Sequence, residues 1–126
     1  MNWQCTEAFV ALGSIALEPL VNFYTQLLGQ QPDPYQSGVY AEFRLPGLRL
    51  AIFSPKPDHQ SEFGQTKTGS MSICLQVMNL LEVIRELQSI NYPVDNIITA
   101  SHGQELYIYD PDGNRLIFYE PRQDIP

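Results

Sequence analysis

Residues 107–121 read Tyr-Ile-Tyr-Asp-Pro-Asp-Gly-Asn-Arg-Leu-Ile-Phe-Tyr-Glu-Pro, which is the most informative stretch of this sequence. Alternating apolar residues on both sides of its centre predict two antiparallel strands, Glu105 to Tyr109 and Leu116 to Tyr119. Residues 110–114 are typical of a tight turn, because proline presets φ and glycine accepts a positive φ. The chain is therefore expected to end in a hairpin.

The second half of this stretch has a counterpart earlier in the chain. Gly113-Asn-Arg-Leu-Ile-Phe-Tyr-Glu-Pro121 corresponds to Gly47-Leu-Arg-Leu-Ala-Ile-Phe-Ser-Pro55, an offset of 66 residues. Phe9-Val-Ala-Leu12 corresponds in the same way to Ser72-Ile-Cys-Leu75, an offset of 63 residues. The shared Gly-x-Arg-Leu, with a proline eight residues after each glycine, indicates an internal duplication.

Each copy is expected to contain a strand, a helix and a hairpin. In the first copy we expect a strand over 8–12, a helix from Glu18 to Leu28 ended by Gly29, and strands over 38–45 and 48–53 around Pro46-Gly47. In the second we expect a strand from Met71 to Val77 and then a helix opening at Asn79, with Glu82 as its capping-box partner. The polar stretch 54–69 has no period and predicts a linker or mobile loop.

The organisation that follows is one α+β domain over 1–126. Module one covers about residues 8–55, a linker covers 56–69, and module two covers about 70–121.

Composition excludes several kinds of partner. The chain has 126 residues, of which 44% are hydrophobic, and a formal net charge of −7. An acidic globular domain without a cluster of Lys or Arg repels phosphate backbones and anionic lipid, so we expect neither nucleic acid nor a membrane as partner. Cys5 and Cys74 are far apart and lack the spacing of a zinc knuckle or a secreted disulfide framework. With no apparent export signal or spanning segment, a cytoplasmic location is expected.

Two β-α-β-β-β modules, with Phe23-Tyr24-x-x-Leu27-Leu28-Gly29 closing the first helix and Asp110-Pro-Asp-Gly-Asn114 before the last strand, resemble the vicinal oxygen chelate superfamily of glyoxalases, bleomycin-resistance proteins and dioxygenases. The resemblance covers roughly residues 8–121. It implies that each module curls into a half-barrel and that the modules form a concave cavity. It also implies a homodimer, with the pairing of modules within one chain or between two left open.

Catalytic members of that family hold a divalent metal with His, Glu or Gln from the first and last strands of each module. The corresponding positions here are Phe9, Ala51, Ser72 and Ile117. These side chains are not a competent set of donors, so neither metal nor cofactor is expected. His59 and His102 are interpreted as solvated or hydrogen-bonded loop residues, and Glu120 would point to the face opposite Ile117.

Strand alternation predicts which side chains face the helices and which face the cavity. The expected core set is aliphatic or aromatic: Val10, Leu12, Leu48, Leu50, Ile52, Ile73, Leu75, Val77, Leu106, Ile108, Leu116 and Phe118. The expected ligand-binding set, beside Ala11 and Ala51, is Phe9, Arg49, Phe53, Ser72, Cys74, Gln76, Tyr107, Tyr109, Arg115, Ile117 and Tyr119. Aromatic rings with a few polar groups suit a pocket for a small hydrophobic or aromatic molecule.

Several alternatives stay open. Arg49 and Arg115 are related by the repeat and form either an anion clamp or ion pairs with carboxylates such as Glu42 or Asp112. The tyrosines either line a pocket or fill the barrel. Cys74 is expected to be an inert small hydrophobe, and no catalytic residue is assigned. The leading hypothesis is a metal-free small-molecule-binding protein. The alternatives are a metal-dependent glyoxalase-like lyase or dioxygenase, and a structural or regulatory protein with a closed cavity.

Overall fold

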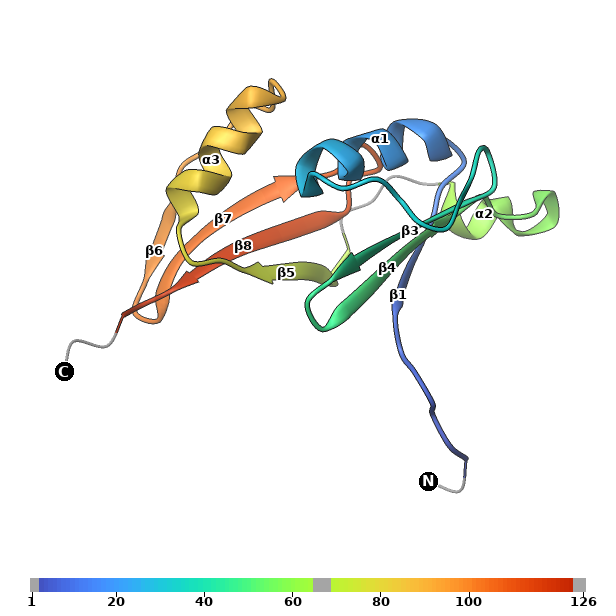
Figure 1. Ribbon diagram of the computed structural model, residues 1–126, viewed down its shortest axis with the longest axis horizontal. Helices are drawn as coiled ribbons and strands as arrows, with labels where there is room; N and C mark the ends of the chain where they lie inside the picture. The colour runs from blue at the N-terminus through green and yellow to red at the C-terminus, as the bar shows by residue number, and fades with distance from the viewer. Residues whose placement is uncertain (1–2, 65–68, 124–126) are drawn as a thin grey trace. The chain divides into compact units, whose positions relative to one another are not determined.

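The computed structural model describes residues 3–64 and 69–123 and is mixed α+β (Figure 1). The chain divides into two compact units, Met1–Gln65 and Thr66–Pro126, and each is described by itself. None of the helices in the described ranges is long and apolar enough to cross a lipid bilayer.

Unit 1 has the predicted order of elements. β1 (Val10–Gly13) leads into α1 (Leu17–Leu28), and the antiparallel strands β3 (Tyr40–Leu45) and β4 (Leu48–Phe53) follow the short β2 (Tyr35–Gln36). The four strands form one sheet in the order β1-β4-β3-β2, in which β1 runs parallel to β4.

Unit 2 repeats this order. β5 (Ser72–Gln76) leads into α3 (Leu80–Ser89), followed by β6 (Ile98–Ala100), β7 (Gly103–Tyr109) and β8 (Arg115–Pro121). Its sheet has the order β5-β8-β7-β6, with β5 parallel to β8. The predicted duplication is thus confirmed, since the strand order and the parallel pairing are the same in both units.

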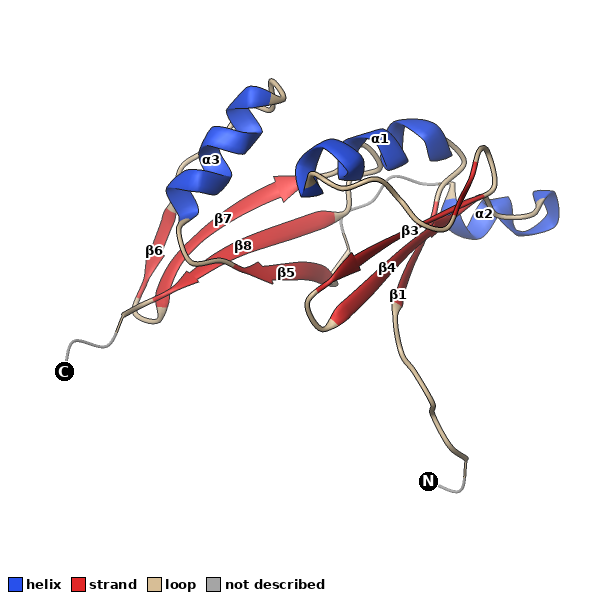
Figure 2. Cartoon of the chain, in the orientation of Figure 1, coloured by secondary structure: helices blue, strands red, loops and turns tan. Residues whose placement is uncertain are grey.

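One long helix packs on the sheet of each unit (Figure 2). In unit 1, Leu20 and Tyr24 of α1 are buried with Leu50 and Ile52 of β4. In unit 2, the buried members of the predicted core are Ile73, Leu106, Ile108, Leu116 and Phe118. The remaining members are half-buried, namely Val10, Leu12, Leu48, Leu75 and Val77. Alternation therefore assigned the helix-facing side of both sheets correctly.

The start of α3 differs from expectation. The Asn79 side chain accepts a hydrogen bond from the Leu81 amide at 3.0 Å, as expected of an N-cap residue. A second side-chain acceptor at this helix start comes from Glu120 at the end of β8, whose Oε1 accepts from the Leu80 amide at 2.7 Å. A glutamate distant in sequence therefore joins Asn79 in capping the helix, a contact that the prediction of Glu82 as capping-box partner did not include.

Residues 57–63 also differ, because part of the stretch expected to be irregular is helical. Pro57–His59 form a 3-10 turn, η1, and Gln60–Phe63 form the short helix α2. Phe63 packs against Phe53 with ring centroids 5.2 Å apart, and this contact gives the segment an apolar anchor that its polar composition did not indicate. Residues 65–68 of the predicted linker lie outside the described residues.

The residue pattern did not locate two short strands, β2 and β6, which complete the β-α-β-β-β order that the family resemblance implied. β2 is linked to α1 by Glu18, whose carboxylate accepts from the Tyr35 hydroxyl at 2.6 Å and the Gly38 amide at 2.7 Å. These bonds, that of Tyr35 first, lower the pKa of Glu18 below its ordinary value. A two-residue strand held by a helix side chain leaves no alternation for a sequence pattern to detect.

The turn between β7 and β8 is organised by Asp110, which is 4% exposed. Its Oδ1 accepts from the backbone amides of Asp112 at 3.0 Å and Asn114 at 2.9 Å. The Asp110 amide donates to the Asn114 carbonyl at 3.0 Å, and Gly113 takes a φ of 88°. The turn therefore closes the hairpin with Tyr109 opposite Arg115.

We predict that Asp110→Ala lowers the free energy of unfolding by about 2 kcal/mol, because two half-buried amides lose a charged acceptor. Asp112→Ala is the matched control in the same turn and is expected to change the free energy of unfolding by about 0.5 kcal/mol or less. Urea unfolding followed by circular dichroism measures both. Equal effects of the two substitutions would contradict this account of the turn.

Candidate functional site

Three rows of side chains cross the non-helical side of the unit 2 sheet. Each row runs from β5 across β8 to β7, as the strand registers show. The rows are Ser72, Arg115 and Tyr109; Cys74, Ile117 and Tyr107; and Gln76, Tyr119 and Glu105. We call this surface the open face of unit 2, made of these nine residues. Eight of them are the residues of unit 2 that alternation had assigned to ligand binding, so the structure places the predicted set of this unit on one face.

The central row of the open face, Cys74, Ile117 and Tyr107, is apolar. Tyr107 is 36% exposed, and Tyr109 in the neighbouring row is 40% exposed. Ile117 of β8, which lies between β5 and β7, is half-buried. Cys74 is a free thiol and is exposed. Its exposure follows from its position on the non-helical side of β5, and the expectation that the thiol is chemically inert stays a prediction.

Arg115 is engaged within its own row. Its Nη1 donates to the Ser72 hydroxyl oxygen at 3.1 Å, in place of the predicted ion pair with Asp112. The β5–β8 register explains this choice, since it sets Ser72 directly beside Arg115. The oxygen of Ser72 is thus used as an acceptor for a guanidinium.

A polar cluster closes one end of the open face. His102 Nε2 lies 2.8 Å from Glu105 Oε1, and the Tyr119 hydroxyl donates to the His102 carbonyl at 3.0 Å. His102 is a hydrogen-bonded loop residue, as predicted. Sequence analysis missed Glu105 as a member of this face, although its spacing of two from Tyr107 carried the signal.

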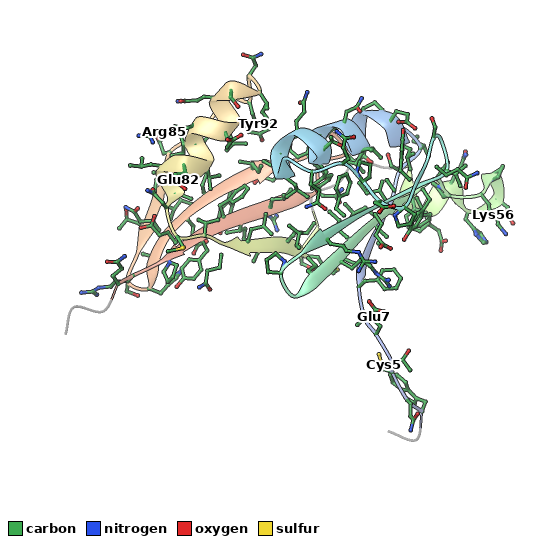
Figure 3. The ribbon with its side chains drawn as sticks, viewed as in Figure 1. Cys5, Glu7, Lys56, Glu82, Arg85 and Tyr92 are labelled. Atoms are coloured by element: carbon green, nitrogen blue, oxygen red, sulfur yellow. The ribbon has the colours of Figure 1, made fainter. Side chains whose placement is uncertain are left out.

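In unit 1, two of the predicted site residues, Phe9 and Arg49, contact each other. The Arg49 guanidinium lies over the Phe9 ring, 4.2 Å from its centroid. It also pairs with Glu7 at 3.5 Å and with Glu42 at 3.6 Å. The ion pair with Glu42 was one of the two predicted alternatives for this arginine. Figure 3 labels Glu7 on the segment before β1, so Arg49 ties that segment to the sheet.

Glu42 is a buried charged residue beside Arg49, and sequence analysis named it only as an ion-pair partner. It is 5% exposed and lies opposite Ala51 in the β3–β4 register. Its carboxylate accepts hydrogen bonds from the Tyr40 hydroxyl at 2.9 Å and from Arg44 Nη2 at 3.1 Å. Burial, followed by the bond to Glu42, raises the pKa of Tyr40 above its ordinary value. The Tyr40 hydroxyl therefore stays protonated at neutral pH and donates to the carboxylate.

The four family metal positions do not fit a metal ion. The Phe9 ring is stacked under Arg49, and Ala51 and Ile117 carry no donor atom. Ser72 offers a hydroxyl that already accepts from Arg115. Within residues 3–64 and 69–123, no three His, Cys, Asp or Glu side chains gather as a metal-binding group. We therefore derive no chemistry through a metal at these positions.

Comparison with known proteins gives one family and many similar structures. The family model described as the Glyoxalase/Bleomycin resistance protein/Dioxygenase superfamily matches residues 9–118. No curated protein matches significantly.

Three solved structures illustrate the similarity of fold. A glyoxalase/bleomycin resistance protein from Catenulispora acidiphila is 22% identical, with a TM-score of 0.69 over 91% of this chain and 97% of that one. A bleomycin-binding protein in complex with bleomycin is 20% identical, with a TM-score of 0.67 over 94% and 100%. A genomically encoded fosfomycin resistance protein from Listeria monocytogenes is 13% identical, with a TM-score of 0.73 over 95% and 96%.

We predict that Arg49→Met lowers the free energy of unfolding by about 2 kcal/mol, because it leaves the carboxylate of Glu42 buried with one cation fewer. Arg44→Met is the matched control. Arg44 lies closer to Glu42, but its side chain is 70% exposed against 23% for Arg49, so a loss of about 0.5 kcal/mol is expected. Urea unfolding of both variants tests whether the burial of the arginine side chain matters more for stability than its distance from the Glu42 carboxylate. A larger loss of stability for Arg44→Met than for Arg49→Met would contradict this expectation.

Proposed function

The chain belongs to the Glyoxalase/Bleomycin resistance protein/Dioxygenase superfamily, and we propose that it is a member that binds a small hydrophobic or aromatic molecule without a metal ion or other cofactor. We also propose that it works as a homodimer, which is what the resemblance to the family favours. A reducing compartment such as the cytoplasm suits the exposed thiols of Cys5 and Cys74.

The observation that carries the proposal is the open face of unit 2. Tyr107 and Tyr109 are exposed on adjacent rows, and Ile117 lies beside Tyr107 in the register. Ile98 of β6 lies opposite Glu105 and is 46% exposed. Large apolar side chains gathered on one face mark a surface that another molecule covers, since each ring gains from leaving water.

The polar groups at the two ends of this face support a ligand that is mainly apolar with few polar atoms. Arg115 with Ser72 lies in one outer row, and Tyr119 with Glu105 and Gln76 lies in the other. Binding sites for small molecules commonly combine an apolar floor with a few such groups, which orient the ligand. The bleomycin complex of a protein with the same fold is a precedent for binding.

We predict that a thermal-shift screen with indole, 1-naphthol and flavone finds at least one compound that stabilises the protein in proportion to its concentration. Tyr107→Ser is expected to weaken binding of that compound about tenfold, because a ring contact in a desolvated site is worth about 1–2 kcal/mol. Leu81→Ser is the control, since Leu81 on α3 is 57% exposed and lies outside the open face. Isothermal titration calorimetry measures all three proteins.

Two results would count against this proposal. One is that no compound stabilises the protein while a crystal structure shows the tyrosines packed solid, which supports a structural role. The other is that the two variants weaken binding equally, which places the ligand elsewhere.

We predict that the melting temperature is unchanged by a chelator and by Ni²⁺, Zn²⁺, Mn²⁺ or Fe²⁺ at concentrations that saturate ordinary protein sites. The reason is that Phe9, Ala51 and Ile117 have no electron pair to donate and the Ser72 oxygen is taken by Arg115. Differential scanning fluorimetry and metal analysis of the purified protein check this. One metal bound at a 1:1 ratio with a raised melting temperature would favour the metal-dependent enzyme instead.

A further inference from the structure

All residues that line one cavity of the protein belong to unit 1, and the cavity lies at the end of β4. It has a volume of about 330 Å³ and is lined by Phe53, Ser54, Pro55, Lys56, His59 and Phe63. Only Phe53 belongs to the predicted ligand-binding set. The other residues come from the stretch 54–69 that was expected to be a loop or linker.

The walls of this cavity are two aromatic rings held in a defined geometry. The Phe53 and Phe63 rings meet edge to face, with centroids 5.2 Å apart and planes at 81°. Gly13 at the end of β1 makes room for them, because a Cβ at this position would come within 2.5 Å of Phe63 Cδ1 and 3.0 Å of Phe53 Cζ. Three separate elements, β1, β4 and α2, thus combine to build an aromatic corner.

One lysine is among the residues that line the cavity, in a chain that is acidic overall. Lys56, labelled beside α2 in Figure 3, is one of only two lysines in the sequence. Among residues 3–64 and 69–123, no carboxylate lies within ion-pair distance of its ammonium group. His59 also lines the cavity, but its Nε2 is 3.9 Å from Asp58 Oδ2, which offsets any charge on that ring.

We propose that this cavity binds a small aromatic carboxylate, with the ring of the ligand against Phe53 and Phe63 and its carboxylate at the Lys56 ammonium. The inference goes beyond the proposed function, because it concerns a separate cavity in unit 1 and names the class of ligand that this cavity would take. The volume is at the low end of the roughly 300–1,000 Å³ of ligand pockets, which suits one ring with a short substituent. One cation beside an apolar wall favours a carboxylate over phosphate, which normally takes several donors.

The test is a titration of the ¹⁵N-labelled full-length protein with benzoate, and separately with its neutral isostere benzamide, at matched ionic strength. We expect saturable shifts of the backbone amides of residues 53–63 with benzoate, and weaker binding of benzamide by about tenfold. Lys56→Gln should weaken benzoate about tenfold and leave benzamide unchanged. Arg85→Gln removes the same charge from an exposed site on α3 and should change neither affinity.

A second pair of variants tests the aromatic wall. Gly13→Ala forces Phe63 to shift and should weaken benzoate and benzamide alike, by about fivefold or more. Phe63→Leu keeps an apolar side chain but removes the ring, and should do the same if Gly13→Ala does not fold.

Three outcomes would overturn the inference: equal affinity for benzoate and benzamide, no effect of Lys56→Gln, or no saturable shift at residues 53–63. Shifts confined to the amides of Tyr107, Tyr109 and Ile117 would also overturn it while leaving the proposed function in place. Conversely, binding at residues 53–63 in a protein whose open face responds to no compound would support this cavity and remove the support for the open face.

Discussion

The register between β7 and β8, which the Asp110 turn sets, is the constraint on which the surface chemistry of unit 2 depends. Side chains alternate along a strand, so a slip of β7 by one residue against β8 would put Leu106 or Ile108 beside Ile117 in place of Tyr107. The aliphatic side chains of β7 would then face solvent, and its tyrosines would lie on the side of α3. A buried carboxylate that binds two backbone amides of one turn therefore determines which residues any ligand meets.

The duplicated fold gives the two units the same backbone and opposite surface chemistry. In unit 1, the buried Glu42 lies opposite Ala51, which occupies one of the family's metal-ligand positions. The charge of Glu42 is balanced by Arg49, Arg44 and the Tyr40 hydroxyl. In unit 2, the row of Ile117 holds a thiol and a tyrosine ring, both exposed. The charge of Glu42 in unit 1 is therefore balanced by neighbouring side chains of the same unit, whereas the apolar groups on the open face of unit 2 are exposed.

Sequence alone predicted the features that depend on local pattern, namely the repeated order of elements along the chain and the side of the sheet on which Tyr107 or Ile117 lies. It did not predict features that depend on contacts between distant residues. The Glu120 cap on α3 joins residues 40 apart, and Phe63 becomes part of a wall only when Phe53 and Gly13 are nearby. Glu105 was not predicted as a member of the open face, although alternation places it on the same side of β7 as Tyr107.

For the metal-free binding that we propose, the free energy must come mainly from buried apolar area, and this limits which ligands each unit is expected to hold. At about 25 cal/mol per Å², covering about 150 Å² of a single ring gives about 4 kcal/mol, which corresponds to a millimolar dissociation constant before ordering costs. A ring in the Phe53 and Phe63 corner therefore needs the Lys56 charge to be held with useful affinity. The open face of unit 2 offers Tyr107, Tyr109 and Ile117 side by side, so a larger apolar ligand can reach micromolar affinity there with no ion pair at all.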